Sequence, residues 1–153
     1  MPTNELDEWD IAHRGLRSFS APEIKTFWNG YIACRKDAPI EHGSLWSRWR
    51  RVSDDLVISL YLTNRSVGLF VRGQRGERWA TTVNRLSAHE PGLGHALGAS
   101  LRDYEGCCYI SNFPLPVTDP ASWPEAYAWL EDREEFYHRV LSELAASGKV
   151  GES

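Results

Sequence analysis

The segment Trp46–Arg51, which reads WSRWRR, holds the residues of this chain that are best suited to binding chemistry. Arginine neutralises phosphate groups and tryptophan rings stack on unpaired bases, so the pattern predicts a surface for single-stranded nucleic acid or another anionic partner. Arginines in and near the turns of the next segment extend the same hypothesis. The candidate residues are Trp46, Arg48, Trp49, Arg50, Arg51, Arg65, Arg72 and Arg75.

A structural interpretation of the same arginines stands beside the binding one. From Arg48 to Arg85 there are eight Arg against three acidic residues, a net charge of +5 that leaves −9 for the rest of the chain. The tryptophans then belong to the core, and the arginines cover the sheet or pair with acidic helices. The pI of 5.7 also lies below the value above about 9 that is typical of a nucleic-acid-binding domain. The acidic run available for pairing is Glu131, Asp132, Glu134 and Glu135.

Glycine and histidine patterns elsewhere do not match a known site. Gly92–Gly98 (GLGHALG) lacks the glycine spacing of a phosphate loop and follows no predicted strand, so it indicates a helix break. His89, Glu90 and His95 are separated by Pro91-Gly92, which interrupts the helical spacing that zinc ligands need. We therefore predict no catalytic residue, no metal site and no cofactor.

The three cysteines favour a reducing compartment. Cys107 and Cys108 are adjacent and Cys34 is distant, which does not resemble a disulfide framework. No spacing places Cys34 beside His13 or His42 as a nucleophile and its base. The start of the chain lacks a signal-peptide pattern and no apolar run reaches 18 residues, so we expect a cytoplasmic protein with no membrane contact.

Two apolar runs within Asp55–Gly73 flank a polar break and predict a β-hairpin. The aliphatic faces of its strands are expected to lie on helices. The opposite faces carry Tyr61 and Phe70, which we expect to be partly exposed together with a tryptophan. An exposed aromatic interface of this kind favours self-association.

A strand over Leu45–Val52 is predicted to precede the hairpin. Its alternation separates two sets of side chains. The first set is Trp46, Arg48 and Arg50, and the second is Ser47, Trp49 and Arg51.

Helices are predicted before and after these strands in the sequence. Ser20-Ala-Pro-Glu23 and Ser122-Trp-Pro-Glu125 both match a capping box, and the last helix should end near Gly148. Residues 39–44 read as a loop, helices should start at Glu77 and at Leu93, and the run 107–113 reads as a strand. The prediction is an α+β fold, a three- to four-stranded mainly antiparallel sheet with helices packed on one face, in the order αβββαβα. The single domain spans 20–148, after an N-terminal extension (1–19) and before a flexible tail (149–153).

Residues from about 22 to 113 resemble the DUF4268 family. The resemblance lies in the aromatic helix KTFWNGYI, the hairpin ISLYLTNRSVGLFVRG, the phrase Ala96-Leu97-Gly98 and the compact strand that follows. The family has no established activity and occurs in bacteria, often beside restriction or other defence nuclease domains. The resemblance therefore implies a bacterial defence or nucleic-acid context.

The order of elements is also similar to the core of PD-(D/E)XK nucleases. Those enzymes hold Mg²⁺ and activate water with a carboxylate on one hairpin strand and an acid-x-Lys pair on the next. The second hairpin strand here, SVGLFVR, has neither an acid nor a lysine. Topology without those residues does not support nuclease chemistry.

We therefore expect a non-catalytic interaction module that works with a protein partner or with a second copy of itself. One alternative is a nucleic-acid-binding protein, which requires Arg48, Arg50 and Arg72 to lie on one exposed face. The other alternative is an enzyme whose site is assembled from scattered residues.

Overall fold

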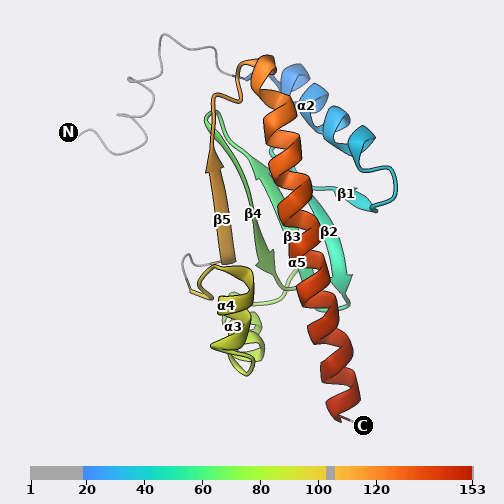
Figure 1. Ribbon diagram of the computed structural model, residues 1–153, viewed down its shortest axis with the longest axis vertical. Helices are drawn as coiled ribbons and strands as arrows, with labels where there is room; N and C mark the ends of the chain where they lie inside the picture. The colour runs from blue at the N-terminus through green and yellow to red at the C-terminus, as the bar shows by residue number, and fades with distance from the viewer. Residues whose placement is uncertain (1–18, 103–105, 153) are drawn as a thin grey trace, which may run out of the picture.

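A computed structural model describes residues 19–102 and 106–152 (Figure 1). Most of the expected N-terminal extension, including His13, lies outside these ranges. Five strands form one antiparallel sheet in the order β1-β2-β3-β4-β5, so each strand pairs with its neighbours in the chain. The strands are β1 (Ile40–His42), β2 (Ser47–Ser53), β3 (Leu56–Leu62), β4 (Ser66–Arg72) and β5 (Cys108–Pro114).

The α+β class is confirmed, but the sheet has five strands where three to four were expected. The additional strand is β1, which lies in the segment that reads as a loop. It is only three residues long and pairs with β2 through Ile40–Arg50, Glu41–Trp49 and His42–Arg48. A segment this short, directly after Pro39, has too few residues to show alternation.

The helices are α2 (Ala21–Cys34), α3 (Trp79–Ser87), α4 (Gly92–Leu97) and α5 (Trp123–Glu152), with a 3₁₀ turn, η1, over Pro120–Ser122. The first capping box is confirmed, because Ser20 Oγ accepts from Glu23 N (3.3 Å) and Glu23 Oε1 accepts from Ser20 N (3.2 Å). The second is wrong. Ser122 Oγ instead donates to the carbonyls of Pro116 and Asp119, and α5 extends beyond Gly148 to Glu152.

Helices α2 and α5 lie on one face of the sheet, while α3 and α4 pack at its end (Figure 1). We call the covered side the helix face and the opposite side the cleft face. The aliphatic stripes of the hairpin lie on the helix face, as predicted, and are buried there. The core residues on this side are Ile24, Phe27, Trp28 and Tyr31 of α2, Leu56, Ile58, Leu60 and Leu62 of β3, Val67, Leu69 and Val71 of β4, and Leu130, Tyr137 and Leu141 of α5.

Two β-bulges interrupt the regular pairing of the sheet. One lies in β2 between Arg51 and Ser53, and the other separates Leu69 from Val71 where β4 meets β5. Tyr109, at the second bulge, has a positive φ of 53°. Bulges bend a strand and increase its twist.

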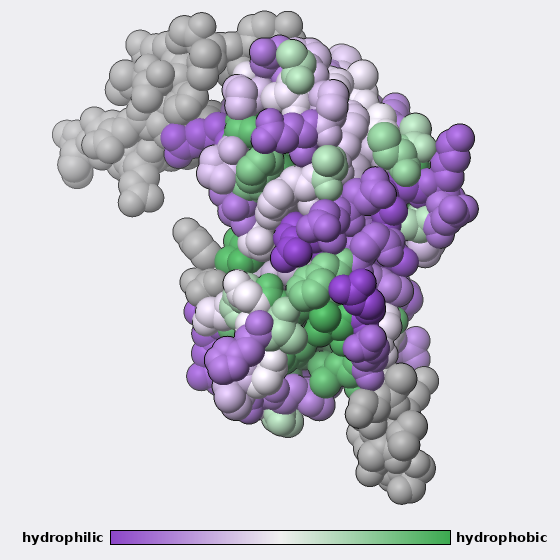
Figure 2. Space-filling model, in the orientation of Figure 1, coloured by the Kyte–Doolittle hydropathy of each residue, from purple (hydrophilic) through white to green (hydrophobic). Residues whose placement is uncertain are grey.

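The surface on the side of α5 is polar along much of its length, with an apolar area beside α4 and the lower half of α5 (Figure 2). Apolar side chains of this half of α5 are only partly buried against the core, among them Phe136, Val140 and Leu144. The side of α5 that faces the sheet also buries one charged residue, Glu134.

Candidate functional site: a basic cleft on the sheet

Strand pairing arranges the side chains of the cleft face in rows that run across β2, β3 and β4. One row is Arg51, Val57 and Arg72, and the next is Trp49, Ser59 and Phe70. In both rows the central strand contributes the smallest side chain. The face is therefore lower along β3 than along its two neighbours.

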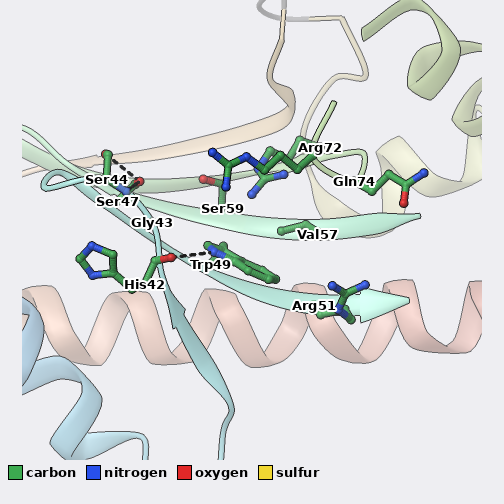
Figure 3. Close-up of a pocket in the computed structure, with 11 residues that line it drawn as sticks. His42, Gly43, Ser44, Ser47, Trp49, Arg51, Val57, Ser59, Arg72 and Gln74 are labelled. Atoms are coloured by element: carbon green, nitrogen blue, oxygen red, sulfur yellow. Dashed lines mark hydrogen bonds between the residues drawn. The ribbon is translucent and has the colours of Figure 1, made fainter. Parts of the chain in front are cut away.

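A cleft of about 480 Å³ lies over this lower part of the sheet. We call it the basic cleft. The turn between β1 and β2 forms one end of it and the turn after β4 the other, and Ser59 and Val57 lie between (Figure 3). Its lining residues are His42, Gly43, Ser44, Ser47, Trp49, Arg51, Val57, Ser59, Arg72, Gln74 and Arg75. A volume of roughly 300–1,000 Å³ is typical of a small-ligand site.

Trp49 is held in a defined position in the wall of the cleft. Its indole Nε1 donates to the carbonyl of His42 at 3.0 Å, which ties it to the edge strand. The guanidinium carbons of Arg51 and Arg72 lie 5.8 and 5.9 Å from the centre of its ring. This separation is within the range of a cation–π interaction, so the indole gathers two positive charges at the cleft.

Positive charge in the cleft is not balanced by a carboxylate in its lining. Within residues 19–102 and 106–152, no acidic side chain forms an ion pair with Arg51, Arg72 or Arg75. Burial and the neighbouring charge of Arg75 lower the pKa of Arg72. Glu41 lies opposite Trp49 in the strand pairing but does not line the cleft. An anionic ligand would relieve this repulsion.

Three serine hydroxyl groups line the cleft, and they differ in their hydrogen bonding. Ser44 and Ser47 bind one another, with 2.9 Å between their Oγ atoms. Ser59 lies on the floor and is only 7% exposed, and its hydroxyl has no hydrogen-bond partner among the described residues. The Ser59 hydroxyl is not one of the fully enclosed polar atoms that lack a partner, so it is open to the cleft and available to a ligand.

The turn between β1 and β2 is fixed from the helix face. Arg48 Nη1 donates to the carbonyls of Ser44 (2.9 Å) and Ser47 (2.7 Å). A Cβ atom on Gly43 would collide with Ser47, so the turn also depends on a glycine at this position. Arg48 therefore acts as a positioning residue that holds the serine end of the cleft without lining it.

The nucleic-acid alternative required Arg48, Arg50 and Arg72 to share one exposed face, and this requirement is not met. A nucleic-acid site built on all three arginines is therefore excluded, and a site for an anion has to use Arg72 without the other two. Arg48 and Arg50 are 4% and 8% exposed and lie on the helix face, whereas Arg72 lies on the cleft face. The guanidinium of Arg48 lies 5.4 Å from the ring centre of Trp28, and burial lowers its pKa. The predicted alternation along β2 is confirmed, and it is this alternation that separates the arginines.

Glu134 of α5 is the counter-charge for Arg50. Its carboxylate, which is 0% exposed, accepts from Arg50 Nη1 at 2.7 Å and from Arg35 Nη2 at 3.0 Å. The hydroxyl of Tyr31 donates to the same carboxylate, and burial raises the pKa of Tyr31, as does the charge of Glu134. Glu135 accepts from both arginines as well. These five residues form the helix-face network, which joins α2, β2 and α5.

The remaining predicted site residues lie apart from the basic cleft. Trp46 is 37% exposed and packs edge-on against Phe19, and Arg65 is in the exposed turn between β3 and β4. Tyr61 and Phe70 are half-buried with ring centres 6.2 Å apart, and the Tyr61 hydroxyl donates to Asn112 at 2.5 Å. Their proposed role in an aromatic interface stays a prediction.

Patterns that were set aside in the sequence have structural explanations. Glu90 Oε2 accepts from Gly94 N at 2.7 Å and from the Tyr109 hydroxyl at 2.6 Å, so it connects the start of α4 to β5. Gly98 ends α4 with a φ of 69°, a conformation that favours glycine. In the described part of the chain, no group of three or more His, Cys, Asp and Glu is placed to hold a metal ion.

Sequence reasoning did not identify Ser44, Ser47, Ser59 and Gln74 as parts of a site. The β1–β2 turn that supplies the two serines could not be located without β1. Ser59 did carry a signal, because it is a small polar residue in the centre of a strand otherwise made of large side chains. Glu134 carried one as well: it stands at helical spacing between the buried residues Leu130 and Tyr137.

No helix in the described ranges is long and apolar enough to cross a membrane. Comparisons with protein-family models, with curated proteins and with solved structures find no match to this chain.

Proposed function

We propose that this protein is a non-catalytic binding module that captures an anionic partner in the basic cleft. One observation carries the proposal: Arg51, Arg72 and Arg75 line a single cleft, and no carboxylate of the described chain pairs with them. Elsewhere, Arg35, Arg50 and Arg85 all have acidic partners. Unpaired arginines gathered around a cleft favour recognition of a negative ligand.

The chemistry of the lining supports binding rather than catalysis. The cleft offers guanidinium, hydroxyl, amide and indole groups and the imidazole of His42, and its lining contains neither a carboxylate nor a thiol. Ser44 and Ser47 use their hydroxyls on each other, and neither is hydrogen-bonded to an imidazole. A nucleophilic serine needs a base within hydrogen-bond reach.

The resemblance of residues from about 22 to 113 to DUF4268 supports a proposal about context. We place the protein in the bacterial cytoplasm, in a defence or nucleic-acid-handling system. The anionic partner is then either a protein segment rich in Asp and Glu, a second copy of this chain, or a nucleic acid. All three bring negative charge to the cleft.

A charge-matched pair of triple variants tests the proposal. The first changes Arg51, Arg72 and Arg75 to Gln, and the control changes Arg102, Arg133 and Arg139 to Gln. The probes are fluorescent forms of a single-stranded dT10, an octaglutamate peptide and a heparin-derived hexasaccharide, each titrated with the full chain by anisotropy. At least one probe is expected to bind, and the cleft variant should bind it at least a hundredfold more weakly, because charge-assisted contacts contribute roughly 1.5–3 kcal/mol each.

The control variant carries the same net charge and is expected to lose less than threefold in affinity. Equal losses in both variants would mean that charge is read diffusely and not in the cleft. Failure of all three probes to bind the unmodified protein would also overturn the proposal. The cleft arginines hold no ion pair with the described residues, and the control removes a surface pair, Arg133–Asp132, which contributes about 0–1 kcal/mol. Both variants should therefore melt within a few degrees of the parent protein.

A further inference from the structure

We infer that the basic cleft takes one nucleotide unit, with its phosphate at Arg72 and Arg75 and its ring beside Trp49. This inference rests on the proposed function and specifies the ligand. The source of the nucleotide is either a free molecule or one residue of an unpaired strand, and the two sources share the chemistry that the cleft recognises.

The phosphate position follows from the charge distribution. Arg72 and Arg75 both line the cleft and are close enough for their charges to interact. Arg72 places Nη1 on the carbonyl of Gly73 at 3.0 Å, which directs the guanidinium and leaves its other donors for a ligand. Arginine binds phosphate oxygens through two parallel N–H donors.

The ring position follows from Trp49. Bases stack on aromatic rings and on the planes of guanidinium groups. Trp49 supplies the aromatic ring. The guanidinium groups are those of Arg51 and Arg72, whose central carbons lie 5.8 and 5.9 Å from the centre of the Trp49 ring. The indole does not rotate freely because its Nε1 is bonded to His42. A rigid stacking surface lowers the entropic cost of binding a flat ring.

The polar groups of the floor distinguish a nucleotide from a chain of carboxylates. Ser59, which is 93% buried, lines the cleft with a hydroxyl that has no hydrogen-bond partner among the described residues, and Gln74 lies at the far end (Figure 3). These neutral donors and acceptors suit the edges of a base or a sugar. An acidic peptide would use the arginines but would leave Trp49 and Ser59 without a role.

A single unit fits better than a duplex. The cleft is local, about 480 Å³, and the chain as a whole carries a net charge of −4. Duplex binding depends on many phosphate contacts over a broad basic surface. The unpaired base of a single strand, or a mononucleotide, reaches the floor of a cleft that a double helix would only cover.

The test titrates the full chain with fluorescent dT10, with the same sequence annealed to its complement, and with octaglutamate. AMP, UMP and inorganic phosphate serve as competitors. Two variants probe the two halves of the site, Arg72→Gln for the phosphate and Trp49→Leu for the ring. Arg139→Gln, on α5 and therefore on the other side of the sheet, is the charge-matched control.

We expect dT10 to bind at least tenfold more tightly than the duplex. Arg72→Gln should weaken dT10 binding at least tenfold and Trp49→Leu at least fivefold, while Arg139→Gln changes it less than twofold. Only Arg72→Gln should flatten the dependence of affinity on salt, because counterion release follows the number of neutralised phosphates. Displacement of dT10 by AMP or UMP identifies a free nucleotide as a sufficient ligand, and binding of the strand alone identifies the strand.

Two results would overturn the inference. In the first, Trp49→Leu leaves binding unchanged while Arg72→Gln weakens it. The site would then bind an anion and would not recognise the ring of a base. In the second, octaglutamate binds through Arg72 and the nucleotide probes do not; the proposed function then stands and its nucleotide form fails. The proposed function and the nucleotide inference fail together only when the cleft arginines contribute to the binding of none of the anionic probes. Circular dichroism and melting of each variant verify that a loss of binding is not a loss of folding.

Discussion

The two faces of β2 give neighbouring arginines opposite environments. Arg50 points to α5 and meets Glu134 at 2.7 Å, whereas Arg51 points to the cleft and lies over the ring of Trp49, with no acidic partner in the described part of the chain. The two residues are adjacent and chemically identical, so the difference comes entirely from what lies opposite. An arginine is structural where a helix brings a carboxylate to it, and it is available to a ligand where none is present.

The helix face also shows what it costs to bury such a charge. Removing charges from water is unfavourable, and the attraction between them compensates only when the remaining donors and acceptors are satisfied. Glu134 meets this condition because Tyr31, Arg35 and Arg50 all donate to it. Among the described residues the cleft face has no equivalent of Glu134, which is the physical basis of our proposal that this face binds a ligand.

The largest expected effect comes from removing the charge that organises the helix face. Glu134→Gln leaves Arg35 and Arg50 buried without their main counter-charge, and we expect the free energy of unfolding to fall by about 3–5 kcal/mol. Urea denaturation measures this loss. Glu131→Gln is the matched control, because Glu131 lies 3.7 Å from Arg35 but is half exposed, and it should cost less than about 1 kcal/mol. Similar losses for both variants would remove the distinction between buried and surface pairing.

A smaller effect compares the adjacent arginines directly. Arg50→Met breaks two charge-assisted hydrogen bonds, to Glu134 and Glu135, and should lower the free energy of unfolding by about 2 kcal/mol. Arg51→Met loses only the contact with Trp49, which contributes about 0.5–1 kcal/mol at an exposed site. Binding of the anionic probes should show the reverse order: the Arg51→Met variant should bind them more weakly than the Arg50→Met variant does. If both properties change together in one variant, the two faces are not independent.

The smallest effect concerns a third arginine, Arg85, at the end of the sheet. Its guanidinium donates to Glu77 at 2.7 and 3.0 Å, and this bond, with help from Thr82, holds the pKa of Glu77 below its ordinary value. A carboxylate with a lowered pKa stabilises the folded state above its unfolded pKa of about 4.3, and that stability is lost as the pH falls through the folded pKa.

Glu77→Gln should therefore lower the urea midpoint at pH 6 and converge with the parent protein near pH 3. Glu125→Gln, at an exposed position of α5, should run parallel to the parent over the same range. A Glu77→Gln deficit that stays constant from pH 6 to pH 3 would show that its contribution is not electrostatic.

Periodicity predicted the helix face well and the cleft poorly. The stripe of Ile24, Phe27, Trp28 and Tyr31 and the alternation of the hairpin strands follow from burial, which repeats along the chain. The same alternation correctly divided β2 into its two sets of side chains. It did not say which set faces the helices, because a strand with charged residues on both faces has no apolar side to orient it.

The cleft itself depends on information that is not local. Its lining combines the β1–β2 turn, two strands and the turn after β4, and these meet only through the register of the sheet. Glu134 on α5, the partner of both arginines, lies 99 residues from Arg35 and 84 residues from Arg50 in the sequence. Ion pairing between residues so far apart in the sequence cannot be predicted from their spacing. The acidic run in the last helix was therefore compatible with a face exposed to solvent and with a face that pairs with the arginines.

The edges of the sheet also bear on how this protein can meet another molecule. The strand β1 covers one edge with three residues, and the bulge between Arg51 and Ser53 distorts the rest of β2. At the other edge β5 carries the bulge at Tyr109 and ends at Pro114, which has no backbone N–H to donate. A short edge such as β1 and a bulged edge such as β5 both resist the addition of a strand from another molecule. A second copy or a protein partner is therefore restricted to binding through side chains, which leaves the faces of the molecule, and not its hydrogen-bonding edges, to specify the assembly.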